Sequence, residues 1–287
     1  MYVIAGVSGN TGSVVADTLL AAKQPVRVIV RDAAKGEPWK AKGAEVAVAA
    51  LEDRAALARA LTGATGAYLL TPPFGLAETG LAERRKQLAA SIVGAVADAR
   101  PGHVVLLSSA GAELESGTGP IQWIRPVEQG LRESGVPSTF LRAGFFVENW
   151  ANSAPGAIES GTLYYGLRGD VKITQIATPD IGKTAAGLLL EGPRGVRVVQ
   201  LSGPVDLTLQ EVADTIGRIA GKPIKAVSVP REATIGAFTG MGASQEVAEL
   251  YADMMDSYNA GRIKWQDGEV VRGTITLEQR LRELLRK

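Results

Sequence analysis

Short apolar runs alternate with longer amphipathic stretches through the first half of the chain. The runs are rich in β-branched residues and are bounded by glycine, proline or polar residues, which is typical of buried strands. They lie at residues 2–5, 26–30, 45–49, 67–70, 104–107 and 139–141. The stretches between them have a helical spacing of apolar residues and lie at residues 12–22, 54–61, 81–99 and 126–134. This alternation predicts right-handed strand–helix–strand units and a parallel sheet.

The second half of the chain has a different pattern. Residues 152–169 are rich in glycine, serine and tyrosine, which predicts loops and short strands. A capping box at residues 208–211 predicts the start of a further helix. We therefore expect an α/β fold, with a Rossmann-type doubly wound parallel sheet in residues 1–150 and a smaller C-terminal α/β lobe in residues 151–287. Another strand is expected at residues 196–201, and it is a candidate to return to the first sheet.

The composition narrows the classes of function. The chain has 287 residues, of which 46% are hydrophobic and 21% are charged, as in ordinary globular proteins and unlike disordered ones. A net charge of +1 and the lack of a long apolar run favour neither a nucleic acid nor a membrane as partner. There is no cysteine and one histidine, His103, so disulfides, thiolate chemistry and a histidine-rich metal site are excluded. No targeting segment is visible, and we expect a cytoplasmic protein without a metal.

A glycine-rich loop follows the first expected strand directly. It reads Gly6-Val7-Ser8-Gly9-Asn10-Thr11-Gly12 and opens the first expected helix, which is the context that a dinucleotide-binding motif requires. Its first glycine allows a tight turn, its second lets the backbone approach a pyrophosphate, and its third lets the helix pack closely on the strand. The amides of Asn10 and Thr11 are then expected to point toward the phosphates, aided by the helix dipole. The alternative is a purely structural turn.

The end of the second expected strand bears on the choice of cofactor. Sites that prefer NAD place an acidic residue there to bind the ribose 2′-hydroxyl. Here Val30 is followed by Arg31 and Asp32, and a guanidinium can hold a 2′-phosphate through bidentate hydrogen bonds. The sequence therefore predicts that NADP(H) is preferred, with NAD(H) as a second option. In the alternative interpretation, Arg31 is a solvated loop charge and Asp32 binds the ribose.

Two later segments, together with the glycine loop and Arg31, carry a family resemblance. They are Leu141-Arg142-Ala143-Gly144-Phe145-Phe146-Val147-Glu148-Asn149 and Ile176-Ala177-Thr178-Pro179-Asp180-Ile181-Gly182. With them the chain resembles an NmrA-like atypical short-chain dehydrogenase/reductase over nearly its whole length, most weakly at residues 231–273. The resemblance implies a doubly wound sheet with a small C-terminal substrate lobe. Bacterial members of this family include NAD(P)H:quinone oxidoreductases, whereas other members are cofactor-sensing regulators.

The resemblance also implies a set of site residues, all at the carboxyl ends of expected strands, where open α/β sheets bind ligands. Those expected to bind the cofactor are Gly6, Ser8, Gly9, Asn10, Thr11, Gly12, Arg31, Leu70, Thr71, Pro72, Ser108 and Phe145, with Ser109 also facing the nicotinamide side. Those expected to face the substrate are Phe146, which also walls the nicotinamide pocket, and Asn149.

Two positions depart from the family pattern. An acidic residue often follows the third strand near the adenine, but Ala50 stands there, which leaves Leu51 and the backbone to contact the adenine. The Tyr-x-x-x-Lys pair of typical superfamily members corresponds to Pro120 and Ile124, and neither side chain can donate a proton. A ketone needs a donor for its developing alkoxide, whereas a quinone delocalises the negative charge. We therefore expect hydride transfer from NADPH to a quinone-like acceptor.

The proton donor and the final function stay open at this point. Tyr164 and Tyr165 are the candidate donors, and the alternative is that both serve only packing. The competing function is an NADP(H)-sensing regulatory protein with little or no catalysis, which acts through a protein partner. Reduction of ketones or alkenes in the manner of isoflavone reductases is disfavoured by Ile124. A small-molecule acceptor is the expected partner, and a homodimer is compatible with the sequence.

Overall fold

The computed structural model describes residues 1–266 and 268–286. The first half contains β1 (Tyr2–Ile4), α1 (Gly12–Ala21), β2 (Val26–Val30), η1 (Ala33–Gly36), α2 (Glu37–Ala41), β3 (Glu45–Val48), α3 (Arg54–Leu61), β4 (Gly66–Leu70), α4 (Leu81–Ala99), β5 (Val104–Ser109), η2 (Gly119–Trp123), α5 (Arg125–Glu133) and β6 (Ser138–Ala143). The second half contains β7 (Phe145–Phe146), α6 (Glu148–Ser160), β8 (Thr162–Tyr165), β9 (Gln175–Ile176), α7 (Thr178–Glu191), β10 (Val196–Ser202), α8 (Leu209–Ala220), β11 (Lys225–Ser228), α9 (Arg231–Gly240), α10 (Gln245–Asn259), β12 (Glu269–Arg272) and α11 (Leu277–Leu285).

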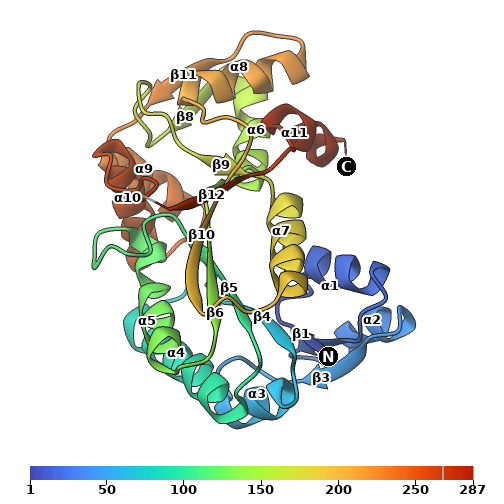
Figure 1. Cartoon of the computed structure of the whole chain (residues 1–287). Helices are drawn as coiled ribbons and strands as arrows, with labels where there is room; N and C mark the ends of the chain where they lie inside the picture. The colour runs from blue at the N-terminus through green and yellow to red at the C-terminus, as the bar shows by residue number, and fades with distance from the viewer. Residues whose placement is uncertain (267, 287) are drawn as a thin grey trace.

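One large sheet of eight strands forms the centre of the molecule (Figure 1). Its strand order is β12-β10-β6-β5-β4-β1-β2-β3, and every neighbouring pair is parallel. The chain direction across the sheet reverses at β1, because β2 lies on one side of it and β4 on the other. In an open α/β sheet, this reversal is the place where ligands bind, beyond the carboxyl ends of the strands. The expected α/β fold of Rossmann type is confirmed.

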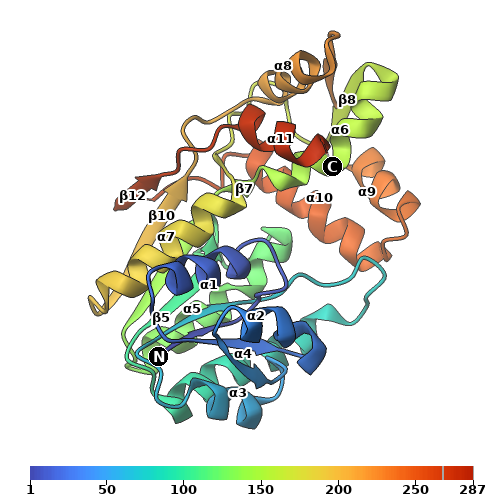
Figure 2. The same ribbon diagram turned by 90° about the vertical axis from the view of Figure 1, so that its right-hand side faces the viewer.

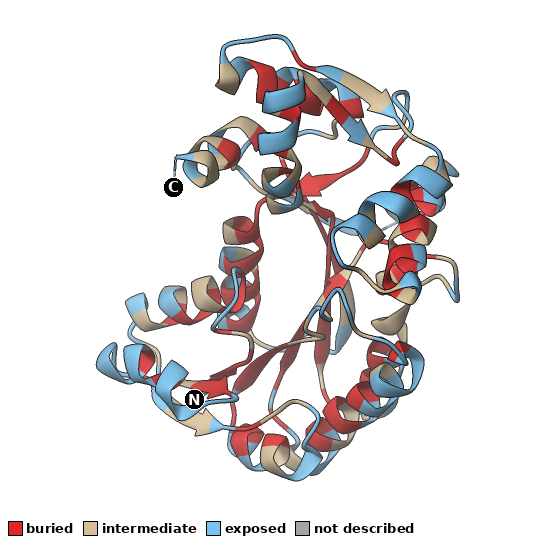
Figure 3. Cartoon of the chain, turned by 180° about the vertical axis from the view of Figure 1, so that it is seen from behind, coloured by how far each residue is buried: buried red, intermediate tan, exposed pale blue. Residues whose placement is uncertain are grey.

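Helices cover both faces of the large sheet (Figure 2). On one face α1 and α7 lie against each other and share a core with the strands, which includes Val15, Leu19 and Leu189. On the opposite face α3, α4 and α5 pack side by side and bury residues such as Leu57 and Ile92. The buried residues therefore concentrate on the strands and on the helix faces turned toward them, as Figure 3 shows.

A smaller lobe stands at the carboxyl end of the sheet, in the upper part of Figure 1. It contains a two-stranded parallel sheet of β8 and β11, the helices α6, α8 and α11, and the pair α9 and α10. Its own core includes Trp150, Ile216, Met255 and Leu281. Because the lobe lies beyond the carboxyl ends of the large sheet, the ends of β4, β5 and β6 face it.

The chain returns to the large sheet twice after residue 150. The strand expected at residues 196–201 is β10, which pairs in parallel with β6 in a register that places Val199 opposite Leu141. β12 then adds a further parallel strand beside β10, with Leu201 opposite Val271. The sequence pattern did not predict β12, because its four residues carry two charges and form an exposed edge.

The expectation of loops and short strands at residues 152–169 is wrong for its first part. Residues 148–160 form α6, which continues through Pro155. The helix forms because one of its faces buries Trp150, Ala154 and Ala157 in the core of the smaller lobe, and this packing outweighs the low helical propensity of glycine and serine. Residues 162–165 form β8, a short strand as expected.

Candidate active site

The loop between β1 and α1 has a conformation that needs glycine at both of its ends. Gly6 lies in the left-handed region, with φ of +70°, and its carbonyl oxygen accepts a hydrogen bond of 2.9 Å from the Gly9 amide. A Cβ atom on Gly12 would lie 2.5 Å from the carbonyl oxygens of both Ala5 and Gly6. Because these are backbone atoms, they cannot move aside. The first and last glycines of the motif therefore fix the path of the chain.

The N-terminus of α1 has unsatisfied amides. Among the described residues, the amides of Asn10, Thr11 and Gly12 donate to no protein acceptor, and no acidic side chain lies in the first turn. The Thr11 hydroxyl makes no capping bond to the helix, and it accepts a buried hydrogen bond of 2.9 Å from the Tyr68 hydroxyl. Burial raises the pKa of Tyr68, so this phenol stays a neutral donor. An uncapped helix N-terminus of this kind attracts anions.

Helix α7 lies directly against this loop, and a glycine makes the contact possible. A Cβ atom on Gly182 would lie 2.5 Å from the Cβ of Val14 and 2.9 Å from the carbonyl oxygen of Thr11. Gly182 ends the second segment that carried the family resemblance. That segment therefore packs against the start of α1.

Arg31 and Asp32 have separate roles at the end of β2. The Asp32 carboxylate accepts a hydrogen bond of 3.0 Å from the Ala34 amide and caps η1. Arg31 is exposed and has neither an ion pair nor a hydrogen bond within the described residues. The acid is thus engaged locally, whereas the guanidinium is free to bind an anion.

Partly exposed residues mark the carboxyl edge of the sheet next to the glycine loop. Leu69 and Leu106 are fully buried within their strands, but Leu70, Thr71 and Ser109 are partly exposed. The Leu70 side chain approaches Gly6, since a Cβ on that glycine would meet its Cδ2 at 2.6 Å. The end of β4 thus lies beside the loop, and β5 is its neighbour in the sheet. Pro72 is also partly exposed there.

Ser108 lies inside the molecule. Its side chain is 3% exposed and donates a hydrogen bond of 2.5 Å to Glu128. Both Glu128 oxygens also accept hydrogen bonds from Arg142, at 3.0 and 2.7 Å, and Arg142 reaches Glu113 at 2.8 Å. Burial opposes the charge of Arg142, but its bonds to Glu128 and the nearby carboxylates prevail and raise its pKa. This buried network, which the sequence did not reveal, fixes the ends of β5 and β6 to α5.

The two phenylalanines after β6 point in different directions, as alternation along a strand requires. Phe145 is buried in the smaller lobe, where its ring lies 5.2 Å from Trp150 and 6.2 Å from Tyr258 between centroids. Phe146 is partly exposed and packs against the core beneath α7. Asn149 is exposed at the start of α6. The structure thus brings Phe146 to the sheet edge and directs Phe145 toward the smaller lobe.

The two candidate proton donors differ in the same way. Tyr164 is 60% exposed on the outer face of β8. Tyr165 lies on the inner face, where its ring centroid is 4.7 Å from that of Trp150. Burial, with a smaller effect from the neighbouring Tyr251 and Tyr258, raises the pKa of Tyr165. Only Tyr165 therefore belongs to the interior of the smaller lobe.

Glu148 joins the two segments that carried the family resemblance. Its carboxylate accepts a hydrogen bond of 3.1 Å from the Thr178 amide and one of 2.6 Å from the Thr178 hydroxyl. Arg280 of α11 donates a further bond of 2.6 Å to the same carboxylate. Asp180 accepts bonds from the amides of Thr274 and Ile275, at 2.8 and 2.9 Å. These two acids connect α6 and α7 to α11 and to the segment before it. Both lie inside the segments that carried the family resemblance, and this position was the sequence signal for their structural role.

The segment after β4 is fixed to α10 at its far end. The Glu246 carboxylate accepts bonds from the amides of Gly80 and Leu81, at 2.7 and 2.9 Å, and so caps α4. Ser244 donates from its amide to Leu76, at 2.8 Å, and from its hydroxyl to Glu78, at 2.6 Å. The segment that starts with Thr71 and Pro72 therefore connects the sheet edge to the smaller lobe.

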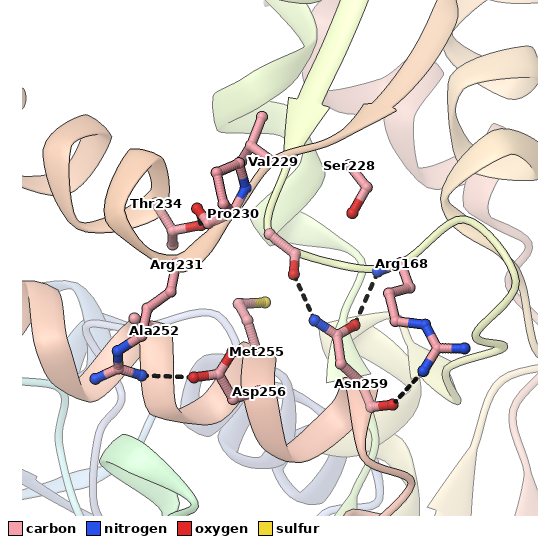
Figure 4. A pocket seen from close by; sticks show the side chains of 11 residues that line it. Arg168, Ser228, Val229, Pro230, Arg231, Thr234, Ala252, Met255, Asp256 and Asn259 are labelled. Atoms are coloured by element: carbon pink, nitrogen blue, oxygen red, sulfur yellow. Dashed lines mark hydrogen bonds and ion pairs between the residues drawn. The ribbon is translucent and has the colours of Figure 1, made fainter.

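A small hollow of about 280 Å³ lies at the carboxyl ends of β8 and β11 (Figure 4). Its polar groups are largely paired with one another. Asn259 bonds the amide of Arg168 and the carbonyl of Gly166, and Arg231 forms ion pairs with Asp253 and Asp256. None of the expected cofactor-binding residues lines it. Within the described residues, no cluster of His, Asp and Glu suits a metal ion, and no helix is long and apolar enough to span a bilayer.

The comparisons with known proteins agree with this arrangement of loop, sheet and lobe. The sequence profile of the NmrA-like family matches residues 2–272. The chain belongs to the NmrA-like family. The match covers the glycine loop, both quoted segments and β12, so the family includes the large sheet and most of the smaller lobe.

Several members of known activity are similar to this NmrA-like protein. An NAD(P)H azoreductase from Xenophilus azovorans is 31% identical over 265 residues, which cover 91% of this chain and 90% of the relative. Quinone oxidoreductase 2 from Escherichia coli strain K12 is 28% identical over 258 residues, which cover 88% of this chain and 86% of the relative. The crystal structure of the Escherichia coli NADPH-dependent quinone oxidoreductase, complexed with NADPH, superimposes with a TM-score of 0.84 at 26% identity, covering 99% of this chain and 100% of the other.

Proposed function

We propose that this protein binds NADP(H) and reduces a flat conjugated acceptor, either a quinone or an azo compound. One observation carries the proposal: the open amides at the start of α1 lie on the same sheet edge as the exposed, unpaired Arg31. An uncapped helix N-terminus fits a pyrophosphate, and a free guanidinium fits a 2′-phosphate. The quinone- and azo-reducing relatives support the class of acceptor.

The chain's own residues would hold the nucleotide at three places. Gly6 and Gly12 keep the backbone close enough for the amides to reach the phosphates. Arg31 would pair with the 2′-phosphate. The Asp32 carboxylate accepts a hydrogen bond from the Ala34 amide and does not form an ion pair with Arg31. The partly exposed edge formed by Leu70, Thr71, Ser109 and Phe146 would support the nicotinamide end. When bound, NADPH supplies a hydride.

The choice of acceptor follows from the side chains beyond β5. Residues 110–134 contain neither tyrosine nor lysine, so this stretch brings no proton donor of the Tyr-x-x-x-Lys type to the sheet edge. A ketone would lack stabilisation for its alkoxide there, whereas a quinone or azo group spreads the negative charge over a conjugated system. The protein's contribution is then to position the acceptor against the cofactor.

Calorimetric titration with NADPH and NADH, followed by optical measurement of NADPH oxidation, tests the proposal. The acceptor panel contains 1,4-naphthoquinone, the azo dye methyl red and a simple ketone. We expect tighter binding of NADPH than of NADH, with turnover of the quinone or the dye and none of the ketone. The absence of any nucleotide binding contradicts the proposal. Binding without turnover of any acceptor favours the NADP(H)-sensing regulator instead.

A further inference from the structure

Aromatic side chains gather along one helix of the smaller lobe, although only 5% of the chain is aromatic. Tyr251 and Tyr258 stand seven residues apart on α10, so they lie on one face, two turns or about 10 Å apart. Tyr258 packs edge-on against Phe145, at 6.2 Å between centroids. Tyr251 stacks on Phe238, at 4.6 Å and an interplanar angle of 5°. Helix α10 therefore links two aromatic groups.

The two groups come from distant parts of the sequence. The first contains Phe145, Trp150, Tyr165 and Tyr258, in contact through three ring pairs. The second contains Phe74, Phe238 and Tyr251, and its Phe74 belongs to the segment that leaves the end of β4. One group thus adjoins the end of β6 through Phe145, and the other adjoins the end of β4 through Phe74. These are the strand ends at which the proposed function places the nicotinamide.

Three phenol groups in this arrangement lack protein partners. Tyr165 and Tyr258 are connected through the rings of Trp150 and Phe145, and Tyr251 lies two turns before Tyr258 on α10. Within the described residues, none of these hydroxyls forms a hydrogen bond. Tyr165 and Tyr251 are partly exposed, and none of the three hydroxyl oxygens is enclosed. Tyr68 behaves as expected of a buried phenol, since it donates to Thr11. Phenols whose rings are packed on other rings, but whose hydroxyls reach the surface and bond no protein group, are available to donate hydrogen bonds to a ligand.

We propose that Tyr165, Tyr251 and Tyr258 form the acceptor site, in which the aromatic rings hold a planar conjugated molecule and the phenols donate hydrogen bonds to its carbonyl or azo groups. This inference rests on the proposed function. In the reaction, the acceptor gains a hydride from NADPH, its π bond shifts an electron pair onto oxygen or nitrogen, and a proton from water neutralises that anion. NADPH, the acceptor and one proton thus become NADP⁺ and the reduced acceptor.

The phenols act in this reaction as donors that keep their protons. Burial raises the pKa of Tyr165, Tyr251 and Tyr258, so all three are neutral at physiological pH. A neutral O–H bonds the anion formed on the acceptor more strongly than it bonds the uncharged acceptor. The three tyrosines therefore bind a charge that a conjugated acceptor has already spread, but they do not supply the proton that the alkoxide from a ketone would need.

Tyrosine-to-phenylalanine variants test the site, because they remove the hydroxyl and keep the ring. For Y165F, Y251F and Y258F we expect kcat/KM with 1,4-naphthoquinone to fall about tenfold to a hundredfold, while NADPH affinity stays unchanged. Y164F is the matched control on the same strand, and we expect no change there because Tyr164 is exposed. Unchanged kcat/KM in all three variants overturns the proposal.

A binding measurement separates this inference from the proposed function. Trp150 lies 4.7 Å from Tyr165, so its fluorescence should be quenched when 1,4-naphthoquinone binds without cofactor. In the double variant Y251F/Y258F we expect the quinone concentration at half quenching to rise at least about tenfold. If the protein shows no NADPH oxidation but keeps this tyrosine-dependent binding, the proposed reduction fails and the site stands. If the double variant binds the quinone as the unmodified protein does, the site is refuted.

Discussion

The glycine loop after β1 and the aromatic face of α10, which Tyr251 and Tyr258 form with the rings packed on them, are built from different kinds of atoms. At the loop, the backbone makes the surface, and each residue acts by lacking a side chain or by leaving its amide open. At α10, side chains from five separate segments make the surface, and the backbone only carries them. A surface made of backbone atoms tolerates almost no added side-chain atoms. A surface made of side chains tolerates substitution of single residues. The first is suited to an invariant ligand such as a nucleotide, and the second to acceptors of varied shape.

The largest expected effect on NADPH binding comes from adding one carbon to the backbone surface. In Gly12→Ala, the new Cβ would meet two carbonyl oxygens at 2.5 Å, so the loop and α1 must separate. We expect NADPH affinity to fall more than about a hundredfold and the free energy of unfolding to fall by about 1–3 kcal/mol. Calorimetry and urea denaturation measure the two effects.

Gly187→Ala is the matched control for this variant, because a Cβ at that exposed position of α7 meets nothing within 4 Å. The stability of the control should rise by up to about 1 kcal/mol, with unchanged affinity. Equal affinities of the two variants for NADPH would show that close backbone approach at Gly12 is not needed.

The second effect concerns the buried charge network that joins β5 and β6 to α5. Among the described residues, Arg142→Ala leaves the buried Glu128 carboxylate with only Ser108 and a distant Arg132 as partners. We expect the free energy of unfolding to fall by about 3–5 kcal/mol. Arg132→Ala, which removes an exposed partner 3.9 Å from Glu128, should cost less than about 1 kcal/mol. Urea denaturation decides between these values, and similar losses in both variants contradict the assigned roles.

Arg31→Ala sharpens the comparison, because Arg31 is the charged side chain that we assign to the nucleotide side. We expect NADPH affinity to fall about tenfold to a hundredfold, since a charge-assisted contact to phosphate is lost, while NADH affinity stays the same. Lys35→Ala is a nearby control at an exposed position, with an expected change of less than about threefold. If the Arg31→Ala protein keeps its preference for NADPH, groups other than Arg31 bind the 2′-phosphate and the assignment is wrong.

The smallest effect tests the opposite, amino-terminal edge of the sheet. Burial, together with repulsion from Arg197, lowers the pKa of His103 from 6.5 to about 4. Between pH 6.5 and 4, His103 is protonated in the unfolded chain but stays neutral in the folded chain. Its contribution to the free energy of unfolding is therefore fully present above pH 6.5 and is lost as the pH falls toward 4.

Urea denaturation at about pH 7 and about pH 5 should differ by about 2 kcal/mol from this group alone. His103→Asn should remove that part of the difference. Affinity for NADPH should not follow the titration, because His103 lies at the far end of β5 from the loop. A matching pH dependence of affinity in the unmodified protein, absent from the variant, would contradict this separation.

The nucleotide side was predictable from sequence because its signals are local. The glycines between an expected strand and an expected helix predicted the tight turn at Gly6 and the close packing at Gly12, and Arg31 follows a recognisable strand. That these residues bind a nucleotide stays a prediction. The alternation of apolar runs predicted the sheet for the same reason. The Ser108 hydroxyl was expected at the cofactor, but its partner Glu128 lies twenty residues further along the chain, and no local pattern records that contact.

The acceptor side depends on contacts between distant segments and was largely hidden. Tyr165 was identified only as one of two candidates, because neighbouring strand positions look alike until the sheet assigns their faces. Tyr251 and Tyr258 stood in a stretch without a readable motif, and their significance depends on Phe74 and Phe145. Helix α6 was missed where its composition resembles a loop, since only burial of Trp150 explains it.

The return of β10 and β12 to the large sheet limits how this protein can be divided or recombined. A cut after residue 150 would leave β6 with an unpaired edge in one fragment and β10 without its neighbour in the other. Both exposed edges would then be prone to aggregation. The smaller lobe therefore cannot be replaced as a separate unit. Any change in the range of acceptors has to come from point substitutions or loop insertions in the intact chain.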